Sequence, residues 1–291
     1  MIYPPFPDKH STKSGFTLIE MSIVLVIIGL IVGGILTGQD LIRNAEIRAT
    51  LSQVDKYKTA AIAFETKFGG LPGDLQETQA SNLGLFAMST ATTIGGPGVG
   101  DGNGLIEGGA ANTTALNGEV LAFFRHLSDA GLIDGSYAAT GTTAGTITTS
   151  GTLGSAITSG SGVNLLLPAI KMGRGNFIIP ASANSINYFV ISGMSSVNIN
   201  VGGIVTGEAN NLTPTEAYAI DTKIDDGLPG SGSVWAINGV SSISTYATVS
   251  APTPTGGATG FSACIVSTVI PNTYNVQANG QYCSLRLLLD L

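Results

Sequence analysis

Residues 16–36, FTLIEMSIVLVIIGLIVGGIL, decide the fold of this chain. The run holds one charged residue, Glu20. A helix rises ~1.5 Å per residue, so these residues span about 30 Å, the thickness of the hydrocarbon core of a bilayer. A carboxylate inside such a run costs about 2.5–3.5 kcal/mol on insertion scales, so Glu20 is a candidate functional residue.

The residues around this run separate several kinds of membrane segment. Residues 1–15 form a polar leader with two lysines and one aspartate, which is expected to stay cytoplasmic. A secretory signal needs a small-x-small cleavage site after the run, and residues 36–40, LTGQD, contain none. A lipoprotein signal needs a cysteine there, but the first one is Cys264. A plain membrane anchor remains an alternative that leaves Glu20 unexplained.

The junction between leader and run carries a resemblance to a known family. Residues 13–20, KSGFTLIE, closely resemble the class III signal of type IV prepilins and type II secretion pseudopilins. The resemblance implies that prepilin peptidase cuts between Gly15 and Phe16 and that the new N-terminus at Phe16 is methylated. It also implies that Glu20, the fifth residue of the mature chain, directs filament assembly. The apolar run is then kept, first as a membrane span and later as filament core.

The helix is predicted to continue beyond the membrane. In residues 39–70, apolar side chains recur at mainly three- and four-residue steps, and charged residues of both signs lie mostly off that stripe. Residues 69–72, Gly-Gly-Leu-Pro, are a strong stop signal. We therefore expect one helix of roughly 50 residues, with a transmembrane part at 16–38 and an amphipathic part at 39–70.

Residues 71–291 are expected to form a pilin-like, β-rich globular head with short helices, so the predicted fold class is α+β. Helices are predicted over 117–133 and 214–224, the second because Thr213-Pro214-Thr215-Glu216 is a strong helix start. Residues 135–170 carry no charge and are predicted to form a Gly/Ser/Thr-rich insertion. Strands are predicted over 163–167, 176–180, 186–192, 197–201, 234–236 and 282–289.

Two acidic segments of the head are candidate calcium sites, because Ca²⁺ takes six to eight oxygen ligands from flexible turns. One is a glycine-rich turn, and the other follows the helix predicted at 214–224. Major pseudopilins bind calcium in a C-terminal loop, but their pattern does not map onto the second segment residue by residue. The alternative for both is a turn with solvated carboxylates. The candidate ligands are Asp101, Asn103 and Glu107 in the first segment and Asp221, Asp225 and Asp226 in the second.

The two cysteines, Cys264 and Cys283, are 19 residues apart. The membrane topology places the head in an oxidising compartment, where a disulfide is favoured over free thiols. Closing a loop of that size stabilises a fold by about 3 kcal/mol in the chain-entropy model.

Composition excludes several functions. Lys+Arg is 12 against Asp+Glu 19, a net charge of −7, so nucleic-acid binding is not expected. Two histidines and two cysteines cannot build a His-rich or Cys₄ metal site. There is no P-loop and no Gly-x-Ser-x-Gly elbow. His126 is predicted to lie on the surface of the helix at 117–133, without a catalytic partner.

These observations predict a structural protein, not an enzyme. The best interpretation is a subunit of a type IV pilus or type II secretion pseudopilus, and a minor one because the head is large. Its expected partners are prepilin peptidase, other pilin or pseudopilin subunits, the inner-membrane assembly platform and membrane lipid; calcium is the one candidate cofactor. It is expected to cross the inner membrane once, with a cytoplasmic N-terminus and a periplasmic or extracellular head, and to join a filament after assembly. A surface adhesin or uptake pilin, which binds a ligand through its uncharged head, is the main alternative. A membrane-anchored periplasmic enzyme is disfavoured by the empty motif search.

Overall fold

The structure is a computed structural model of the 291-residue chain. It divides into two compact units, residues 1–45 and 46–291, and each is described by itself. The leader residues 1–14 and most of the insertion predicted at 135–170 lie outside the described residues. The residues described are 15–87, 100–107, 118–137, 157–158, 163–183, 185–193, 196–198, 204–206, 212–238, 264–266, 272–278, 280 and 283–290.

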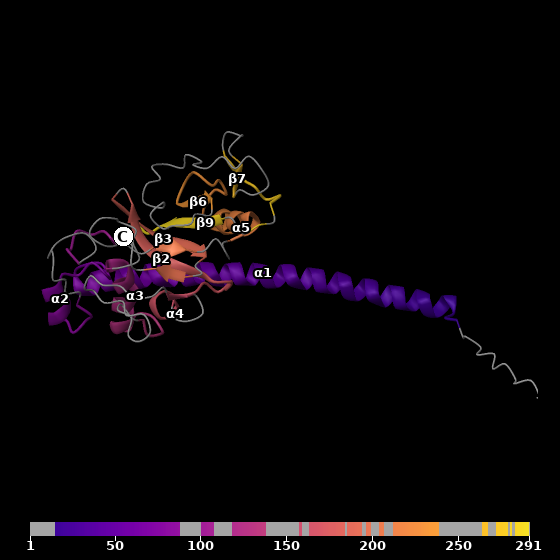
Figure 1. Ribbon diagram of the computed structural model, residues 1–291, viewed down its shortest axis with the longest axis horizontal. Helices are drawn as coiled ribbons and strands as arrows, with labels where there is room; N and C mark the ends of the chain where they lie inside the picture. Colours follow the sequence, from indigo (N-terminus) through magenta and orange to yellow (C-terminus); the bar gives the residue numbers. More distant parts are fainter. Residues whose placement is uncertain are drawn as a thin grey trace, which may run out of the picture. The chain divides into compact units, whose positions relative to one another are not determined.

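The N-terminal helix α1 (Leu18–Phe68) is one continuous element of 51 residues, as the sequence predicts (Figure 1). It ends where Gly69 takes a φ of 77°, a conformation that glycine adopts without a steric penalty. An 18-residue window of α1 has a mean hydropathy of 2.6, and none of that window is buried within the protein. By length and composition this part of α1 can cross a membrane.

In the second unit, α1 contributes one stripe of side chains to the core. Ile47, Val54 and Ala61 lie seven residues apart and are buried. The ring of Tyr57 packs edge-on against Phe124, with centroids 5.2 Å apart. The predicted amphipathic pattern therefore corresponds to a buried face of this part of the helix.

The head is built on a four-stranded antiparallel sheet in the order β2-β3-β9-β6. Phe189 of β3 lies 5.6 Å from Phe123 and 6.4 Å from Phe124, measured between ring centroids, so helix α3 packs on the sheet. Helix α3 runs from Glu119 to Asp129. The strands are β2 (Asn176–Ala183), β3 (Ile186–Gly193), β9 (Cys283–Leu288) and β6 (Val234–Asn238).

Smaller elements complete the described part of the head. A three-stranded sheet has the order β1-β4-β5, and β7 pairs with β8. The α+β class is confirmed, because a long N-terminal helix is followed by antiparallel sheet and short helices. The remaining elements are α2 (Glu77–Asn82), α4 (Val163–Leu166), α5 (Pro214–Ile224), β1 (Ile157–Thr158), β4 (Ser196–Asn198), β5 (Ile204–Thr206), β7 (Ile265–Val266) and β8 (Thr273–Tyr274).

One predicted strand, over residues 163–167, is wrong, because this run forms the short helix α4. The Leu167 amide donates to the Val163 carbonyl at 2.9 Å, and Val163, Leu166 and Leu167 are all buried. Their spacing of three and four residues is one helix face. A short apolar run does not distinguish a buried strand from a buried helix by periodicity.

The start of α5 is confirmed in detail. Thr213 Oγ1 accepts from the Glu216 amide at 3.3 Å, and Glu216 Oε2 accepts from the Thr213 amide at 2.9 Å. These reciprocal bonds are a capping box. The Glu216 carboxylate is buried and also pairs with Arg174, which tethers the loop before β2 to α5.

Cys264 and Cys283 form a disulfide. Cys283 is the first residue of β9, and its backbone exchanges two hydrogen bonds of 2.9 Å with Leu212. The disulfide therefore ties residues 264–266 to the end of a strand inside the four-stranded sheet.

Candidate functional site

The N-terminal end of α1 is closed by its own side chains. Thr17 precedes the first helical residue, and its Oγ1 accepts from the Glu20 amide at 3.3 Å. Glu20 Oε2 accepts from the Thr17 amide at 2.8 Å and from the Thr17 hydroxyl at 2.7 Å. This is a second capping box, which the sequence prediction missed although it used the same Thr-x-x-Glu signal at Thr213.

This cap lies directly beside the predicted cleavage junction. Phe16 is 84 % exposed, and the space around Gly15 is open. Cleavage between these residues would create an amine one residue before Thr17, whose amide already contacts Glu20. A new positive charge and the Glu20 carboxylate would therefore share one helix end, where a negative side chain is also favoured by the helix dipole.

Three carboxylates converge in the head at the glycine-rich turn. Asp74, Asp101 and Glu119 each place an oxygen within 4.8 Å of the others. Asp74 accepts from the amides of Gly102 and Gly104, both at 2.7 Å. Glu119 accepts from the amides of residues 100 and 107, at 2.8 and 2.7 Å. The buried carboxylates of Asp74 and Glu119 thus hold the turn at residues 100–107 in place.

The electrostatics of this cluster favour a bound proton or cation. Burial raises the pKa of Glu119 to about 8 and that of Asp74 to about 6. Each backbone hydrogen bond to these carboxylates acts in the opposite direction, but burial has the larger effect. A divalent cation would compensate the same charges, and carboxylate oxygens are the ligands that Ca²⁺ prefers.

The predicted ligands of the first segment divide into two groups. Asp101 belongs to the three-carboxylate cluster, but Glu107 does not. Asn103 Nδ2 donates to Asp101 Oδ2 at 3.1 Å and to Glu107 Oε2 at 3.3 Å, so its nitrogen faces both carboxylates. The Asn103 oxygen accepts from the Leu105 amide at 2.7 Å, which fixes this orientation. Asp74 and Glu119 were not predicted, because residues distant in sequence supply them.

The second predicted cluster is assembled as expected from Asp221, Asp225 and Asp226, whose oxygens also lie within 4.8 Å of one another. Tyr274 donates its hydroxyl to Asp221 Oδ2 at 2.7 Å, and Ser231 donates to Asp226 Oδ2 at 2.5 Å. Backbone amides of residues 227–234 donate to all three carboxylates. Burial raises the pKa of Asp221 to about 6. The arrangement orders the turn after α5 and presents oxygen atoms to a cation.

The prediction that His126 lies on the surface is wrong, since its side chain is buried. Nδ1 accepts from the Gly73 amide at 2.9 Å, so Nε2 carries the proton and donates to the Phe86 carbonyl at 2.7 Å. The ring stacks on Phe64, with centroids 5.8 Å apart. Burial lowers the pKa of His126, which favours the neutral ring. The prediction failed because α3 is buried on several sides, so its sequence shows no simple polar face. His126 connects the segment that follows α1 to α3.

The comparisons with known proteins agree with the N-terminal geometry. Residues 10–36 match the family model described as the prokaryotic N-terminal methylation motif. This motif is the class III signal of type IV prepilins and pseudopilins, and it includes Gly15, Phe16 and Glu20. No curated protein and no solved structure matches the chain.

The predicted signal is therefore confirmed. Together with an apolar helix that is long enough to span a bilayer, it fits a membrane-anchored, processed subunit of the pilin or pseudopilin type. It points to a structural subunit rather than an enzyme.

Proposed function

We propose that the chain is a minor subunit of a type IV pilus or a type II secretion pseudopilus. The observation that carries the proposal is the methylation motif at residues 10–36, which coincides with the apolar start of α1. The minor role is supported by the size of the head, which is large for a major pseudopilin.

Processing and topology follow from the same motif. Prepilin peptidase removes residues 1–15, and the new N-terminus at Phe16 is methylated. Residues 16–38 cross the inner membrane once, residues 39–70 continue as the amphipathic part of the helix, and residues 71–291 form the head. The N-terminus is cytoplasmic before cleavage, and the head is periplasmic or extracellular. After assembly the subunit is part of a filament.

Assembly uses α1 and the charge on Glu20. The apolar faces of neighbouring helices pack together, and each Glu20 neutralises the N-terminal amine of another subunit. Removing either partner of a buried charge pair leaves an uncompensated charge, so this pair favours the arrangement of subunits in which Glu20 meets the amine. The exposed cap at Thr17 and Glu20 supports this proposal, since it presents the carboxylate at the helix end where the amine is created. The inner-membrane platform and membrane lipid complete the set of partners.

The intact mass of protein extracted from membranes tests this function. The expected mass is that of a chain beginning at Phe16 with one added methyl group. Protein from a strain without prepilin peptidase is the control and should keep its leader. A full-length mass in the strain with active peptidase would contradict the proposal.

Calcium binding in the head is a second, separate proposal. Its ligands are the carboxylates that converge in each turn: Asp74, Asp101 and Glu119 in the first and Asp221, Asp225 and Asp226 in the second. The convergence of three carboxylates in each turn supports it. Chelation should lower the melting temperature of the full chain, and elemental analysis should find calcium. If chelation does not change the melting temperature and no metal is found, neither turn binds calcium, and their carboxylates are solvated or protonated.

The adhesin or uptake-pilin alternative remains a prediction. The uncharged segments on which it depends, in residues 135–170 and 227–285, lie mostly outside the described residues.

A further inference from the structure

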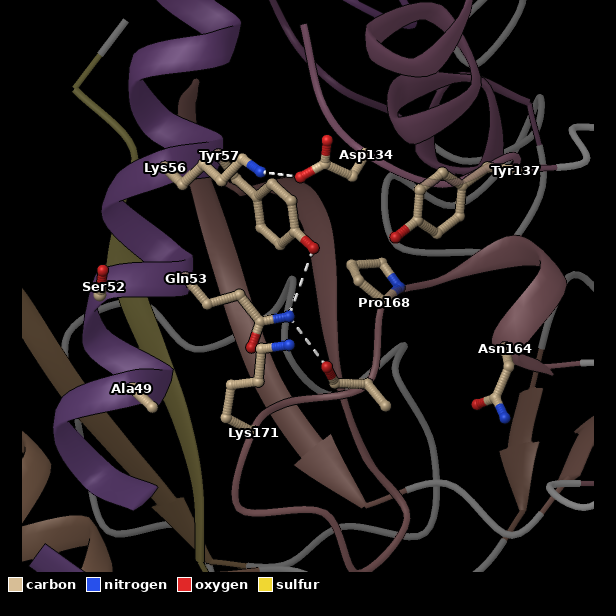
Figure 2. A pocket seen from close by; sticks show the side chains of 11 residues that line it. Ala49, Ser52, Gln53, Lys56, Tyr57, Asp134, Tyr137, Asn164, Pro168 and Lys171 are labelled. Atoms are coloured by element: carbon tan, nitrogen blue, oxygen red, sulfur yellow. Dashed lines mark hydrogen bonds and ion pairs between the residues drawn. The ribbon is translucent and has the colours of Figure 1, made fainter. Parts of the chain in front are cut away.

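A cavity of about 440 Å³ lies in the second unit, beside α1 (Figure 2). One wall is a face of α1 that includes Gln53 and Tyr57, and the opposite wall comes from residues after α3 and α4. The cavity shares no lining residue with either acidic cluster. Its volume is within the range of small-molecule sites in proteins.

The side-chain amide of Gln53 is oriented by hydrogen bonds within this wall. Its Nε2 donates to the Ala169 carbonyl at 2.9 Å and to the Tyr57 hydroxyl at 3.3 Å. Because the Ala169 carbonyl only accepts, the nitrogen must face it, and the orientation of the amide is fixed. Gln53 Oε1 is then buried, and it has no hydrogen-bond partner among the described residues. Because Oε1 has almost no accessible surface, it is not available to a ligand in the cavity, and the fixed Gln53 side chain forms part of the wall.

Rings form the apolar part of the cavity. Tyr57, Tyr137 and Pro168 all line it, and Figure 2 shows both tyrosines on the border of the same space. Tyr137 is held in place by packing on Phe124, with ring centroids 5.6 Å apart. Burial and the neighbouring Tyr57 raise the pKa of Tyr137, so its hydroxyl stays protonated at neutral pH. Flat rings beside fixed polar groups suit a ligand with an apolar face and a hydroxylated edge.

The charge of the cavity favours an anion. Lys56 and Lys171 both line it, and Lys56 is paired with Asp134 at 2.5 Å. Among the described residues, no carboxylate lies within ion-pair distance of Lys171. The cavity therefore carries one positive charge in excess, although the whole chain has a net charge of −7. A carboxylate on the ligand would form a charge-assisted hydrogen bond with Lys171.

We propose that this cavity binds an acidic sugar, a hexuronate unit either free or at the end of a polysaccharide. The sugar carboxylate binds Lys171, a ring hydroxyl accepts from the Tyr137 hydroxyl, and the C–H face of the ring packs against Tyr57. This goes beyond a role in filament assembly, because it assigns the head a ligand of its own.

Isothermal titration of the full chain in detergent tests the proposal. The probes are D-glucuronate and a tetramer of galacturonate, with glucose and acetate as controls that lack the carboxylate or the ring. D-glucuronate should bind, and glucose and acetate should bind at least about tenfold more weakly. Tighter binding of the tetramer indicates a polysaccharide end as the source, and equal binding of the two indicates the free sugar.

Two variants locate the site. Lys171→Ala should weaken binding of D-glucuronate about tenfold, whereas Lys223→Ala, the same charge change on α5, should leave it unchanged. Tyr137→Phe keeps the ring and removes the hydroxyl, and it should also weaken binding. The melting temperature of each variant shows whether it is folded, and Lys171→Ala decides the matter if Tyr137→Phe is not.

Three results would overturn the proposal. The first is no binding of either uronate at millimolar concentration. The second is equal binding of acetate or glucose. The third is equal weakening by Lys171→Ala and Lys223→Ala, or weakening by neither, since the ligand would then bind elsewhere.

Discussion

Replacing Glu119 by glutamine should change how the stability of the head depends on pH and on calcium. Glu119 is fully buried, and its two oxygens accept from the amides of Gly100 and Glu107. Burial raises its pKa from an ordinary value of 4.5 to about 8. Its protonated form is therefore favoured by folding. The corresponding stability is fully present below pH 4.5 and is lost as the pH rises through about 8.

The magnitude follows from the size of this shift. Each pKa unit corresponds to about 1.4 kcal/mol, so the free energy of unfolding should fall by up to about 5 kcal/mol in the absence of metal. Glutamine does not titrate, but its amide nitrogen cannot accept the second of the two backbone hydrogen bonds. Glu119→Gln should therefore be less stable than the wild type by about 1–2 kcal/mol at pH 5, and it should be the more stable protein at pH 8, where the wild type has lost the larger contribution.

Calcium should reduce the difference in stability between the two proteins at pH 8. A bound cation compensates the ionised Glu119, and a ligand at a hundred times its Kd stabilises by about 2.7 kcal/mol. Glutamine lacks this charge, so Glu119→Gln should gain less stability from calcium than the wild type. At pH 8, calcium should therefore raise the melting temperature of the wild type by several degrees, at about 2–4 °C per kcal/mol, and raise that of Glu119→Gln by less.

The assay is thermal unfolding of the full chain in detergent at pH 5 to 8, with calcium or with chelator. Glu65→Gln is the matched control, because Glu65 is exposed on α1 and its replacement should preserve the wild-type slope. Identical pH slopes for the wild type and Glu119→Gln would refute the role of Glu119 as the titrating group. If calcium does not change the melting temperature of the wild type at pH 8, the cluster of Asp74, Asp101 and Glu119 binds protons but not calcium.

Three further predictions concern other parts of the chain. Protein taken from the cell envelope and alkylated without reductant should show neither Cys264 nor Cys283 labelled, and two alkylated thiols would disprove the pairing. Glu20→Ala should prevent the pull-down of partner pilins but leave carbonate-resistant membrane insertion intact. Thr17→Ala removes the cap hydroxyl but keeps the Glu20 charge, so it should retain most co-assembly. Equal losses of co-assembly in the two variants would mean that the cap, and not the charge, is required. Because burial lowers the pKa of His126 below 6.5, the stability it contributes is present above that pH and is lost as the pH falls through the lowered pKa. The wild type should therefore lose more melting temperature between pH 7 and pH 5 than His126→Gln, and parallel curves would contradict this.

The sequence predicted the elements whose signals are local. The apolar run, the Gly-Gly-Leu-Pro stop and the capping box at Thr213 each depend on a few consecutive residues, and the helices they predict are present. The five residues at 163–167 satisfy the periods of both a strand and a helix, and only the burial of Val163 and Leu166 together in the tertiary structure selects the helix.

The candidate sites were predictable only where their members are neighbours in the chain. Asp221 lies in the last turn of α5, and Asp225 and Asp226 follow directly in the turn after it, so local chain geometry brings the three together. Asp74 and Glu119 come from segments on either side of the glycine-rich turn, and no spacing rule connects them. His126 was misplaced for a related reason, since its partners Gly73 and Phe86 are distant in sequence.

The strand order of the main sheet has a consequence for folding during synthesis. β9 is the last described strand in chain order, yet it lies between β3 and β6 and pairs with both. Before residues 283–288 are synthesised, β2 and β3 can pair as a hairpin, but β6 has no neighbour in this sheet. Until β9 is added, the growing chain therefore has two unpaired strand edges, which are sites of aggregation and proteolysis. A chaperone that covers these edges would act during this interval, and Cys283 can pair with Cys264 only after it.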